Sequence, residues 1–373
     1  HTENTSDRMV NHLGNWRNGE LGNFITLKRG FDLPQQKRED GQVPIFSSSG
    51  ITGTHSTAMV NAPGVITGRY GTIGEVFYAA EDFWPLNTTL FVEDFHGNDA
   101  KFIYYFLKTL EWSKFTSASA VPGINRNTVH KETVSLPDIE TQRIIASTLS
   151  MLDEKIKTNT EINDNLADLL QTIYQGRFGN DILAVNQGVL SDICSYSTDK
   201  VAVSELNVRT YFSTENMLSG KAGSTEATSL PTTSQTTACH KGDTLISNIR
   251  PYFKKIVYCE DKCGCSTDVL CFTPSQPCYS AYLFSTLYAD KFFAFMVAGS
   301  KGTKMPRGDK QQIMTYPVVL PSEEELAGFN TIASPLLEQI YSNRAENKRL
   351  SILRDTLLPK LMSGEIDVSA IQL

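Results

Sequence analysis

Two segments of the 373-residue chain carry apolar residues at alternating spacings of three and four. Such spacing puts the residues on one face of a helix and is typical of the a and d positions of a coiled coil. It predicts long helices at about residues 151–176 and 335–362, preceded by shorter helices at about 138–149 and 322–333. The residues expected to pair the long helices are Leu152, Ile156, Asn159, Asn163, Leu166, Leu336, Ile340, Asn343, Asn347 and Leu350.

Small polar residues and glycines mark the expected ends of the long helices. Ser150 fits the N-cap of the first helix, and Ser334, which a proline follows, fits the N-cap of the second. Gly176 and Gly364 are typical residues at which a helix stops. These signals predict that each long helix is separate from the shorter one before it.

Each long helix keeps two asparagines on its otherwise apolar face, Asn159 with Asn163 and Asn343 with Asn347. A buried asparagine costs stability but penalises wrong registers, because its amide needs a partner. The amides can pair only when the two helices lie side by side. A paired coiled coil is the interpretation favoured here, and two solvated helices with asparagines aligned by chance are the alternative.

The chain is internally duplicated. When the sequence is shifted by 184 residues, residues 121–178 align with residues 305–362 without a gap. Upstream, residues 64–92 resemble residues 242–272 in a shifted register. A repeat of this kind indicates two copies of one structural unit, each a β-rich globular part followed by a helical segment.

The globular parts alternate short strand-like runs with glycine and proline turns. The predicted strands include residues 65–67 and 76–78 in the first copy and residues 244–246 and 256–258 in the second. A helix is expected after each sheet region, at about residues 100–112 and 279–296. The sequence thus divides into four segments, which are residues 1–137, 138–187, 188–321 and 322–373.

The net charge of −7 is unusual for a protein that binds DNA, but the charge is unevenly distributed. Residues 138–189 and 322–373, which hold the predicted helices, carry net charges of −4 and −3. The rest of the chain is close to neutral and contains local basic clusters. The acidic helices can therefore face protein partners. No stretch approaches the roughly 18 apolar residues of a membrane helix, so no membrane association is expected.

All seven cysteines lie in the second half of the chain. An odd number without a regular framework is typical of reduced thiols, so a cytoplasmic protein is expected. A zinc site at Cys259, Cys263, Cys265 and Cys271 is conceivable, but the spacing lacks the paired C-x-x-C of strong zinc motifs. Buried or incidental thiols are the favoured interpretation, and no metal site is expected.

Signatures of catalysis are missing from the sequence. It contains no P-loop motif, no H-E-x-x-H motif and no tetrapeptide like the Asn-Pro-Pro-Tyr of amino-methyltransferases. We therefore expect a protein that is not an enzyme. Two other classes stay open: a non-catalytic protein scaffold built on a duplicated coiled coil, and a metal-dependent nuclease.

Several short motifs follow one another along the chain. They are Trp16, Leu21-Gly22, Arg29-Gly30, residues 68–74 (GRYGTIG), residues 86–91 (LNTTLF), Leu136-Pro137 and residues 357–366 (LLPKLMSGEI). Over about residues 14–370 the chain resembles the specificity (S) subunit of type I restriction-modification enzymes. The second copy departs from the first, since residues 247–252 (SNIRPY) stand in place of the glycine-rich motif.

The resemblance implies an α+β fold. Two α/β target recognition domains, residues 1–137 and 188–321, would be separated by an antiparallel coiled coil of two long helices, with a pseudo-two-fold internal repeat. Residues 138–187 and 322–373 would be the helical spacers. Each recognition domain is expected to read one half of a bipartite sequence in double-stranded DNA. Because the glycine-rich motif is not repeated, the two half-sites should differ.

The resemblance also implies protein partners. Two methyltransferase (modification) subunits would dock on the helical spacers, and restriction motor-nuclease subunits would join them. Adenine methylation and DNA cleavage would belong to those partners, which would hold S-adenosylmethionine, ATP and magnesium. No cofactor is expected on this chain.

Phosphates attract cations and backbone amides, while base edges are read by forked donors and amides. In the first domain the residues expected to contact DNA are Lys28, Arg29, Arg69, Tyr70, Asn125 and Arg126. In the second domain they are Arg250, Tyr252, Lys254, Lys255, Lys301, Lys304 and Arg307. The alternative for Arg69 is an ordinary surface turn, and the alternative for the glycine-rich basic loop at residues 299–308 is a flexible linker.

Overall fold

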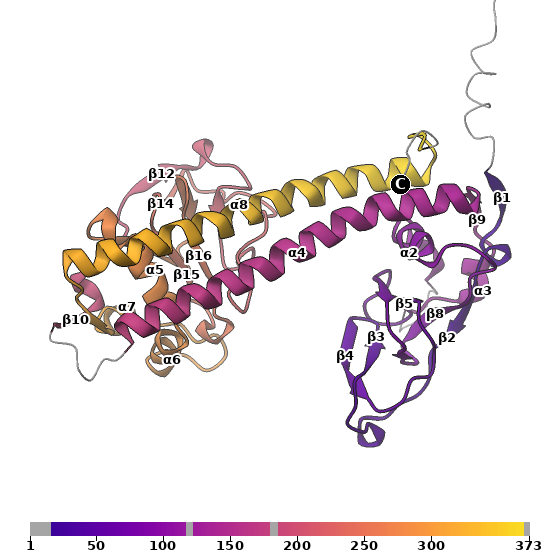
Figure 1. Cartoon of the computed structure of the whole chain (residues 1–373), viewed down its shortest axis with the longest axis horizontal. Coiled ribbons are helices and arrows are strands. Elements are labelled where there is room, and N and C mark those ends of the chain that lie inside the picture. Colours follow the sequence, from indigo (N-terminus) through magenta and orange to yellow (C-terminus); the bar gives the residue numbers. More distant parts are fainter. Residues whose placement is uncertain (1–15, 117–121, 180–185, 369–373) are drawn as a thin grey trace, which may run out of the picture. The chain divides into compact units, whose positions relative to one another are not determined.

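The structure is a computed structural model, and it describes residues 16–116, 122–179 and 186–368. Contacts within the chain divide it into two compact units. Unit 1 comprises residues 1–157 and 347–373, and unit 2 comprises residues 158–346. Each unit contains one globular part and a portion of each of two long helices, α4 and α8 (Figure 1).

Unit 1 is built on a four-stranded antiparallel sheet. In spatial order its strands are β2 (Thr26–Arg29), β8 (Thr89–Asp94), β5 (Gly64–Gly68) and β6 (Val76–Ala79). Successive side chains of a strand point to opposite faces. On β5, Val65 therefore joins the core beneath helix α2 (Ala100–Lys108), while Ile66 joins a second core with Phe46 and Phe83. The predicted strands at residues 65–67 and 76–78 are confirmed.

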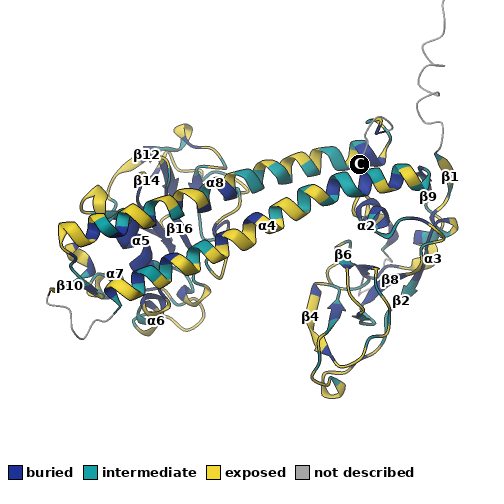
Figure 2. Ribbon diagram, viewed as in Figure 1, coloured by how far each residue is buried: buried dark blue, intermediate teal, exposed yellow. Residues whose placement is uncertain are grey.

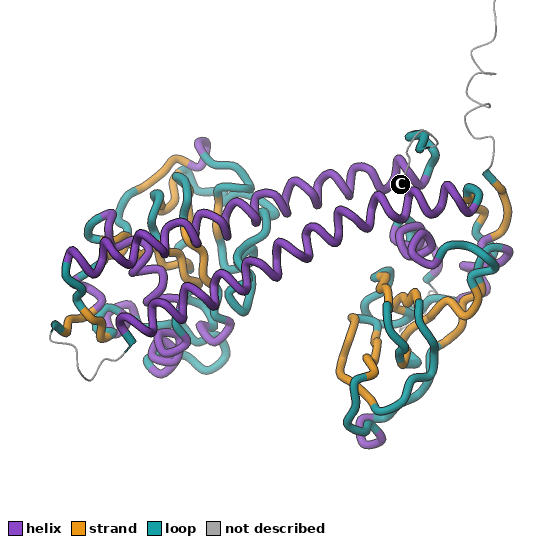
Figure 3. The backbone as a smooth tube through the Cα atoms, viewed as in Figure 1, coloured by secondary structure: helices purple, strands orange, loops and turns teal. Residues whose placement is uncertain are grey.

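Smaller elements complete the globular part of unit 1, and long loops connect them (Figure 3). A second sheet has β3 (Val43–Ser47) between β4 (Gly50–His55) and β7 (Trp84–Pro85). The β1 and β9 strands, Arg17–Glu20 and Thr133–Leu136, pair with each other. The short helices are η1 (Leu21–Asn23), η2 (Gln35–Lys37), η3 (Trp112–Phe115) and α3 (Arg126–His130).

Unit 2 repeats this plan. Its main sheet has the order β11 (Cys194–Tyr196), β18 (Val269–Pro274), β15 (Thr244–Ser247) and β16 (Ile256–Tyr258). Its second sheet has the order β12 (Lys200–Ala202), β14 (Gln235–Cys239), β17 (Cys263–Cys265) and β13 (Tyr211–Phe212). The β10 and β19 strands, Gln187–Val189 and Pro317–Val319, pair as β1 and β9 do. The main sheets match in strand order, which confirms the predicted internal duplication, whereas the second sheets differ, with three strands in unit 1 and four in unit 2.

The helices of unit 2 differ from expectation in one place. The single helix expected at about residues 279–296 is two helices, α5 (Ser280–Tyr288) and α6 (Asp290–Ala298). Ala289 lies between them with an extended backbone, which ends α5 and starts α6 in a new direction. The remaining short helices are η4 (Leu190–Asp192), η5 (Val203–Glu205), η6 (Pro251–Phe253), η7 (Pro277–Tyr279) and α7 (Lys310–Ile313).

The two long helices are continuous, so the predicted breaks before residues 151 and 335 are wrong. Helix α4 spans Ile139–Phe178 and α8 spans Glu323–Met362, 40 residues each. Ser150 and Ser334 lie inside them as ordinary helical residues. No helix within the described residues has an apolar stretch long enough to cross a membrane.

The first turns of α4 and α8 are capped further upstream than predicted. Asp138 accepts the Thr141 N–H at 2.9 Å. Ser322 and Glu325 form a reciprocal capping box, in which Ser322 Oγ accepts the Glu325 N–H and Glu325 Oε2 accepts the Ser322 N–H. Gly176 does not stop α4, which runs two residues further. Gly364, whose φ is +75°, follows the end of α8 as predicted.

Side-chain amides pair α4 with α8 within unit 2. Asn343 Nδ2 donates to Asn163 Oδ1 at 2.9 Å, and Asn159 Nδ2 donates to Glu346 Oε2 at 2.7 Å. Asn159, Asn163 and Asn343 are all buried. As residue numbers rise along α4 they fall along α8, so the helices are antiparallel there. The facing sides of the helices are mostly buried or partly buried, and their outer sides are exposed (Figure 2).

Within unit 1 the helices pair through a different set of polar contacts. Asn347 Nδ2 donates to the Ile156 carbonyl oxygen at 3.1 Å. Arg354 Nη1 donates to Asp153 Oδ1 at 2.7 Å, and the Tyr105 hydroxyl of α2 donates to the other Asp153 oxygen. Asp153 thus joins three helices, α2, α4 and α8. Of the helix-pairing residues named from the sequence, none is fully exposed.

Replacing Asn343 by alanine removes the amide donor to the buried Asn163 oxygen. We expect Asn343→Ala to lower the free energy of unfolding by about 1–3 kcal/mol, since a buried acceptor loses its partner. Urea unfolding of the full chain measures this loss. The matched control is Ser342→Ala, an exposed neighbour on the same helix. Equal losses for the two variants would contradict the amide pairing.

Candidate DNA interface

The loop that follows β5 in unit 1 is held between two other segments. The Arg69 N–H donates to the Thr88 carbonyl at 2.8 Å, and the Arg69 carbonyl accepts the Ile124 N–H at 3.0 Å. Tyr70 forms a β-bridge with Gly123. A Cβ at Gly123 would lie 2.2 Å from the Tyr70 ring, so only glycine allows this approach. The loop is therefore fixed in shape by its backbone contacts.

Charged and aromatic side chains gather at this loop. The guanidinium carbon of Arg69 lies 4.5 Å from the centre of the Tyr70 ring, which orients the side chain. Asn125 caps α3 by accepting the Asn127 N–H, and Arg126 is the exposed first residue of that helix. Because Ile124 joins Arg69 to the segment that contains Asn125 and Arg126, the structure brings these residues to one region.

The ends of two strands place a further cation beside the loop. Arg29 pairs with Leu90, and Gly68 pairs with Thr89 on the other side of β8. Arg29 and the loop after Gly68 therefore emerge at the same edge of the sheet, and Arg29 is exposed. Lys28 forms an ion pair with Glu93 on the neighbouring strand. It therefore contributes less positive charge to this edge than the sequence suggested.

The hairpin turn between β3 and β4 borders the same loop and was not anticipated. A Cβ on Gly71, whose φ is +75°, would lie 3.3 Å from Ser48 Oγ. On β4, Ile51 is 64% exposed, which is the largest exposure of a large apolar residue in the described chain. The sequence there is Ser47-Ser48-Ser49-Gly50, a typical uncharged turn, so nothing in it signalled a binding surface.

In unit 2 the equivalent loop, which follows β15, is held by similar backbone contacts. Ile249 forms a β-bridge with Arg307, and the Arg250 N–H donates to the Pro306 carbonyl at 2.8 Å. Asp309 caps α7 as Asn125 caps α3, and the two caps are equivalent in the sequence repeat. The two units therefore share the backbone contacts that hold the loop, while the side chains on the loop differ.

The side chains of the second loop divide into buried and exposed ones. Arg250 has a left-handed backbone, with φ of +50°, and its Nε is buried. Tyr252 and Phe253 are 50% and 38% exposed, with ring centroids 4.8 Å apart. Sequence reasoning missed Phe253, because it weighed cations above aromatic residues. This exposed pair makes the loop an aromatic surface rather than a purely cationic one.

The basic loop at residues 299–308 is ordered, which argues against a flexible linker. The backbone N–H groups of Lys301 and Arg307 each donate to the other residue's carbonyl at 2.9 Å and close the loop. Lys301 pairs with Asp309 at 2.5 Å, and Arg307 pairs with Asp268 at 3.1 Å. Lys304 is exposed. The loop lacks acids in sequence, but acids from outside it approach in space.

Two predicted cations of unit 2 are engaged within the protein. Lys254 Nζ lies 3.0 Å from Asp290 Oδ1, and Lys221 reaches the same oxygen at 2.7 Å. Hydrogen bonds from these two lysines lower the pKa of Asp290. Lys255 Nζ donates to the Thr214 carbonyl at 2.6 Å. Exposed ion pairs contribute little stability, so phosphate oxygens can replace a carboxylate there at small cost.

Metal ligands do not form part of either loop. Among the residues that the structure describes, no three or more His, Cys, Asp and Glu side chains are grouped so that they could hold a metal ion. The four cysteines that the sequence raised for zinc lie in a core of unit 2, away from bulk solvent. The chemistry of the two loops is therefore that of cations, amides and aromatic rings.

A family model for the type I restriction modification DNA specificity domain matches residues 14–167. Residues 14–167, less than half of the chain, are thus similar to this specificity domain. The MjaIX specificity subunit of Methanocaldococcus jannaschii is 34% identical over 73 residues, which are 20% of this chain and 17% of that protein. The HindI specificity subunit of Haemophilus influenzae is 43% identical over 49 residues, or 13% of this chain and 11% of that protein. The chain thus aligns with less than a fifth of either relative.

The fold of the chain extends the similarity beyond those stretches. The crystal structure of the type I restriction-modification system S subunit from M. genitalium has a TM-score of 0.65. It is 19% identical and covers 93% of this chain and 96% of its own. The predicted fold class, with two mixed α/β parts and a pair of long antiparallel helices, is confirmed.

Arg69 is the cation that the first loop orients most closely. If Arg69 reads bases, we expect Arg69→Ala to weaken binding of a DNA duplex by about 1–3 kcal/mol, because a donor to a base edge would be lost. Titration of labelled duplex at fixed salt measures the change. The control is Lys114→Ala, since Lys114 is an exposed cation of unit 1 that pairs with Glu111. A loss no greater than that of the control would remove Arg69 from the interface.

Helix α3 is tied to β2 by a neutral histidine. His130 Nε2 accepts the Leu27 N–H at 2.9 Å, which an imidazolium cannot do. Burial, then the charges of Arg126 and His96, lower the pKa of His130. A lowered folded-state pKa means that this stabilisation is complete above the unfolded value, about 6.5, and is lost as pH falls below it toward the folded value.

The glutamine variant tests this pH dependence. Glutamine offers an oxygen acceptor that does not titrate, so His130→Gln should flatten the fall in melting temperature between about pH 7.5 and pH 5.5. Thermal unfolding across this range measures it. An unchanged pH profile in the variant would show that another group causes the loss.

Proposed function

We propose that this chain is the DNA sequence-recognition subunit of a type I restriction-modification complex. Its two globular parts each read one half of a bipartite target in double-stranded DNA. The chain directs adenine methyltransferase subunits and restriction motor-nuclease subunits to that target and is not itself an enzyme. The substrate of the whole complex is cellular DNA, so the complex acts in the cytoplasm.

The observation that carries this proposal is the reuse of one loop frame with different side chains. The Tyr70–Gly123 bridge and the Ile249–Arg307 bridge are equivalent, and a capped short helix follows each. Unit 1 presents a guanidinium stacked on a tyrosine. Unit 2 presents an exposed Tyr252–Phe253 pair. Two loops with equivalent backbone contacts but different side chains suit a target made of two different half-sites.

Exposed apolar side chains on the long helices support docking of protein partners. In unit 1, Met151 is 54% exposed, Ile352 47% and Leu353 46%. In unit 2, Leu169 is 46% exposed. Apolar groups on the solvent side of a helix favour contact with another protein. We assign these surfaces to methyltransferase subunits, two per chain, because each helical segment has a copy in the repeat.

Catalysis and cofactors are assigned to the partners. S-adenosylmethionine would belong to the methyltransferase subunits, and ATP with magnesium to the motor-nuclease subunits. The pattern of loops supports this division, since they offer cations, amides and aromatic rings for binding DNA. A scaffold that holds proteins together without binding DNA is the competing function, and it predicts methylation that is independent of this chain.

Mapping of adenine methylation tests the proposed function. Cells carrying the methyltransferase are compared with and without this chain. We expect a split motif, two short half-sites with a fixed gap, that disappears when the chain is deleted. Methylation that persists unchanged without the chain would favour the scaffold. Degradation of DNA by the isolated chain with magnesium would instead favour a nuclease.

A further inference from the structure

One small core of unit 2 consists largely of thiols. It contains Cys239, Cys259, Cys263, Cys265 and Cys271 together with Met217, Leu245, Val257 and Val269. All five cysteines are buried and reduced. They come from the end of β14, the end of β16, β17 and β18, so distant parts of the sequence converge on one cluster. We call these five residues the thiol cluster.

Two sulfurs of the thiol cluster are in direct contact. Cys263 Sγ lies 3.5 Å from Cys259 Sγ. These residues flank the three-residue turn, residues 260–262, that joins β16 to β17. A disulfide bond is about 2.05 Å long, so the sulfurs need to approach by about 1.5 Å. Side-chain rotation beside an exposed turn supplies such a movement without rearranging the sheet.

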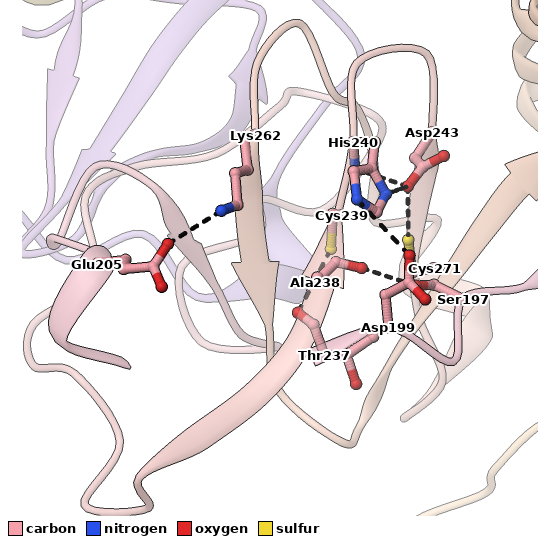
Figure 4. A network of polar contacts seen from close by, with 10 residues as sticks. All are labelled: Ser197, Asp199, Glu205, Thr237, Ala238, Cys239, His240, Asp243, Lys262 and Cys271. Carbon is pink, nitrogen blue, oxygen red and sulfur yellow. Dashed lines mark hydrogen bonds and ion pairs between the residues drawn. The ribbon is translucent and has the colours of Figure 1, made fainter. Parts of the chain in front are cut away.

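The other three thiols donate to oxygen atoms. Cys271 Sγ donates to Asp243 Oδ2 at 3.2 Å, within the polar network of Figure 4. Cys239 Sγ donates to the Thr237 carbonyl, and Cys265 Sγ to the Val269 carbonyl, both at 3.8 Å. Cys239 also faces Cys263, as its partner across the paired strands β14 and β17, whereas Cys259 and Cys263 adjoin the exposed turn.

The two contacting sulfurs have unlike acidities. Hydrogen bonding with Cys239 and with Cys259 lowers the pKa of the Cys263 thiol, and the nearby charge of His240 adds to this. Hydrogen bonding with Cys239 lowers the pKa of the Cys259 thiol, but hydrogen bonding with Cys263 and burial outweigh it and raise this pKa well above its ordinary value. The His240 ring lies between Asp199 and Asp243, 3.7 Å from a carboxylate oxygen of each (Figure 4). The thiolate is the nucleophile in thiol oxidation, so Cys263 reacts first.

We propose that Cys259 and Cys263 form a reversible intrachain disulfide when the protein meets hydrogen peroxide. The Cys263 thiolate attacks one peroxide oxygen, which breaks the O–O bond and gives a sulfenic acid with release of hydroxide. The Cys259 sulfur then attacks the Cys263 sulfur, and the sulfenic oxygen leaves as water. In total, two thiols and one peroxide give one disulfide and two waters.

Peroxide suits the burial of this pair. Cys259 is 2% exposed and Cys263 is 4% exposed, so a bulky oxidant has poor access to either sulfur. A molecule close to the size of water can reach them when the adjoining turn opens. Asp261 and Lys262 in that turn are exposed. The inference rests on this geometry and does not depend on the proposed function.

Peptide mapping of the full chain tests the proposal. The protein is treated with hydrogen peroxide, alkylated and digested with trypsin, which cuts after Lys255, Lys262 and Lys291. We expect residues 256–262 to be linked to residues 263–291, with the mass of two hydrogens lost and both peptides released by dithiothreitol. Fragment spectra place the bond at Cys263 among the four cysteines of the second peptide.

Variants sharpen the assignment. Cys263→Ser should abolish the linked peptide, while Cys278→Ser, at an exposed thiol outside the cluster, should leave it unchanged. Absence of a disulfide in the wild-type chain would overturn the proposal, as would a bond through Cys239. Stoichiometric zinc in the untreated protein, with all five thiols resisting peroxide, would overturn it too and assign the thiol cluster to a metal.

Discussion

The pairing of α4 with α8 is the constraint on which both cores depend. In unit 1 the main core takes Leu149 from α4 and Leu361 from α8. In unit 2 it takes Leu170 from α4 and Phe329 from α8. Neither globular core is therefore complete without residues from both helices. In unit 2 the Asn163–Asn343 hydrogen bond fixes which residues face each other, because any slip would leave a buried amide unpaired.

The two loops of the candidate interface, one after β5 and one after β15, take their positions from these cores. Each loop follows a buried strand of the main sheet and is bridged to the segment that precedes a short capped helix. Those contacts use backbone groups and glycines, so side chains can change without loss of the frame. The same backbone contacts can therefore hold loops whose exposed side chains differ. Affinity comes largely from phosphate contacts, whereas specificity comes from side chains at the base edges.

Much of the fold was predictable because its signals are periodic. The helical seam and the shift of 184 residues are repeated patterns, and chance rarely produces them together. The helix ends were harder. Ser150 looks like a cap, but Leu149 beside it is fully buried, and packing of the apolar face carries α4 through this point. A capping residue does not end a helix when tertiary packing favours its continuation.

The candidate interface was only partly predictable, because sequence does not show which charges meet. Lys254 forms an ion pair with Asp290, and Arg307 forms one with Asp268, although the partners are far apart in the sequence. The exposed Phe253 and the turn at Ser48 carry no charge and gave no signal. The sequence also did not predict that five cysteines meet in one core, because their spacing matches no motif.

Methylation mapping with single-loop variants tests most directly whether each loop reads its own half-site. Arg69→Ala alters the loop of unit 1, and Tyr252→Ala alters the equivalent loop of unit 2. If each loop reads one half-site, each variant relaxes the sequence of one half of the methylated motif and leaves the other half and the gap unchanged. Simultaneous change of both halves, or of neither, would contradict a separate reader in each unit.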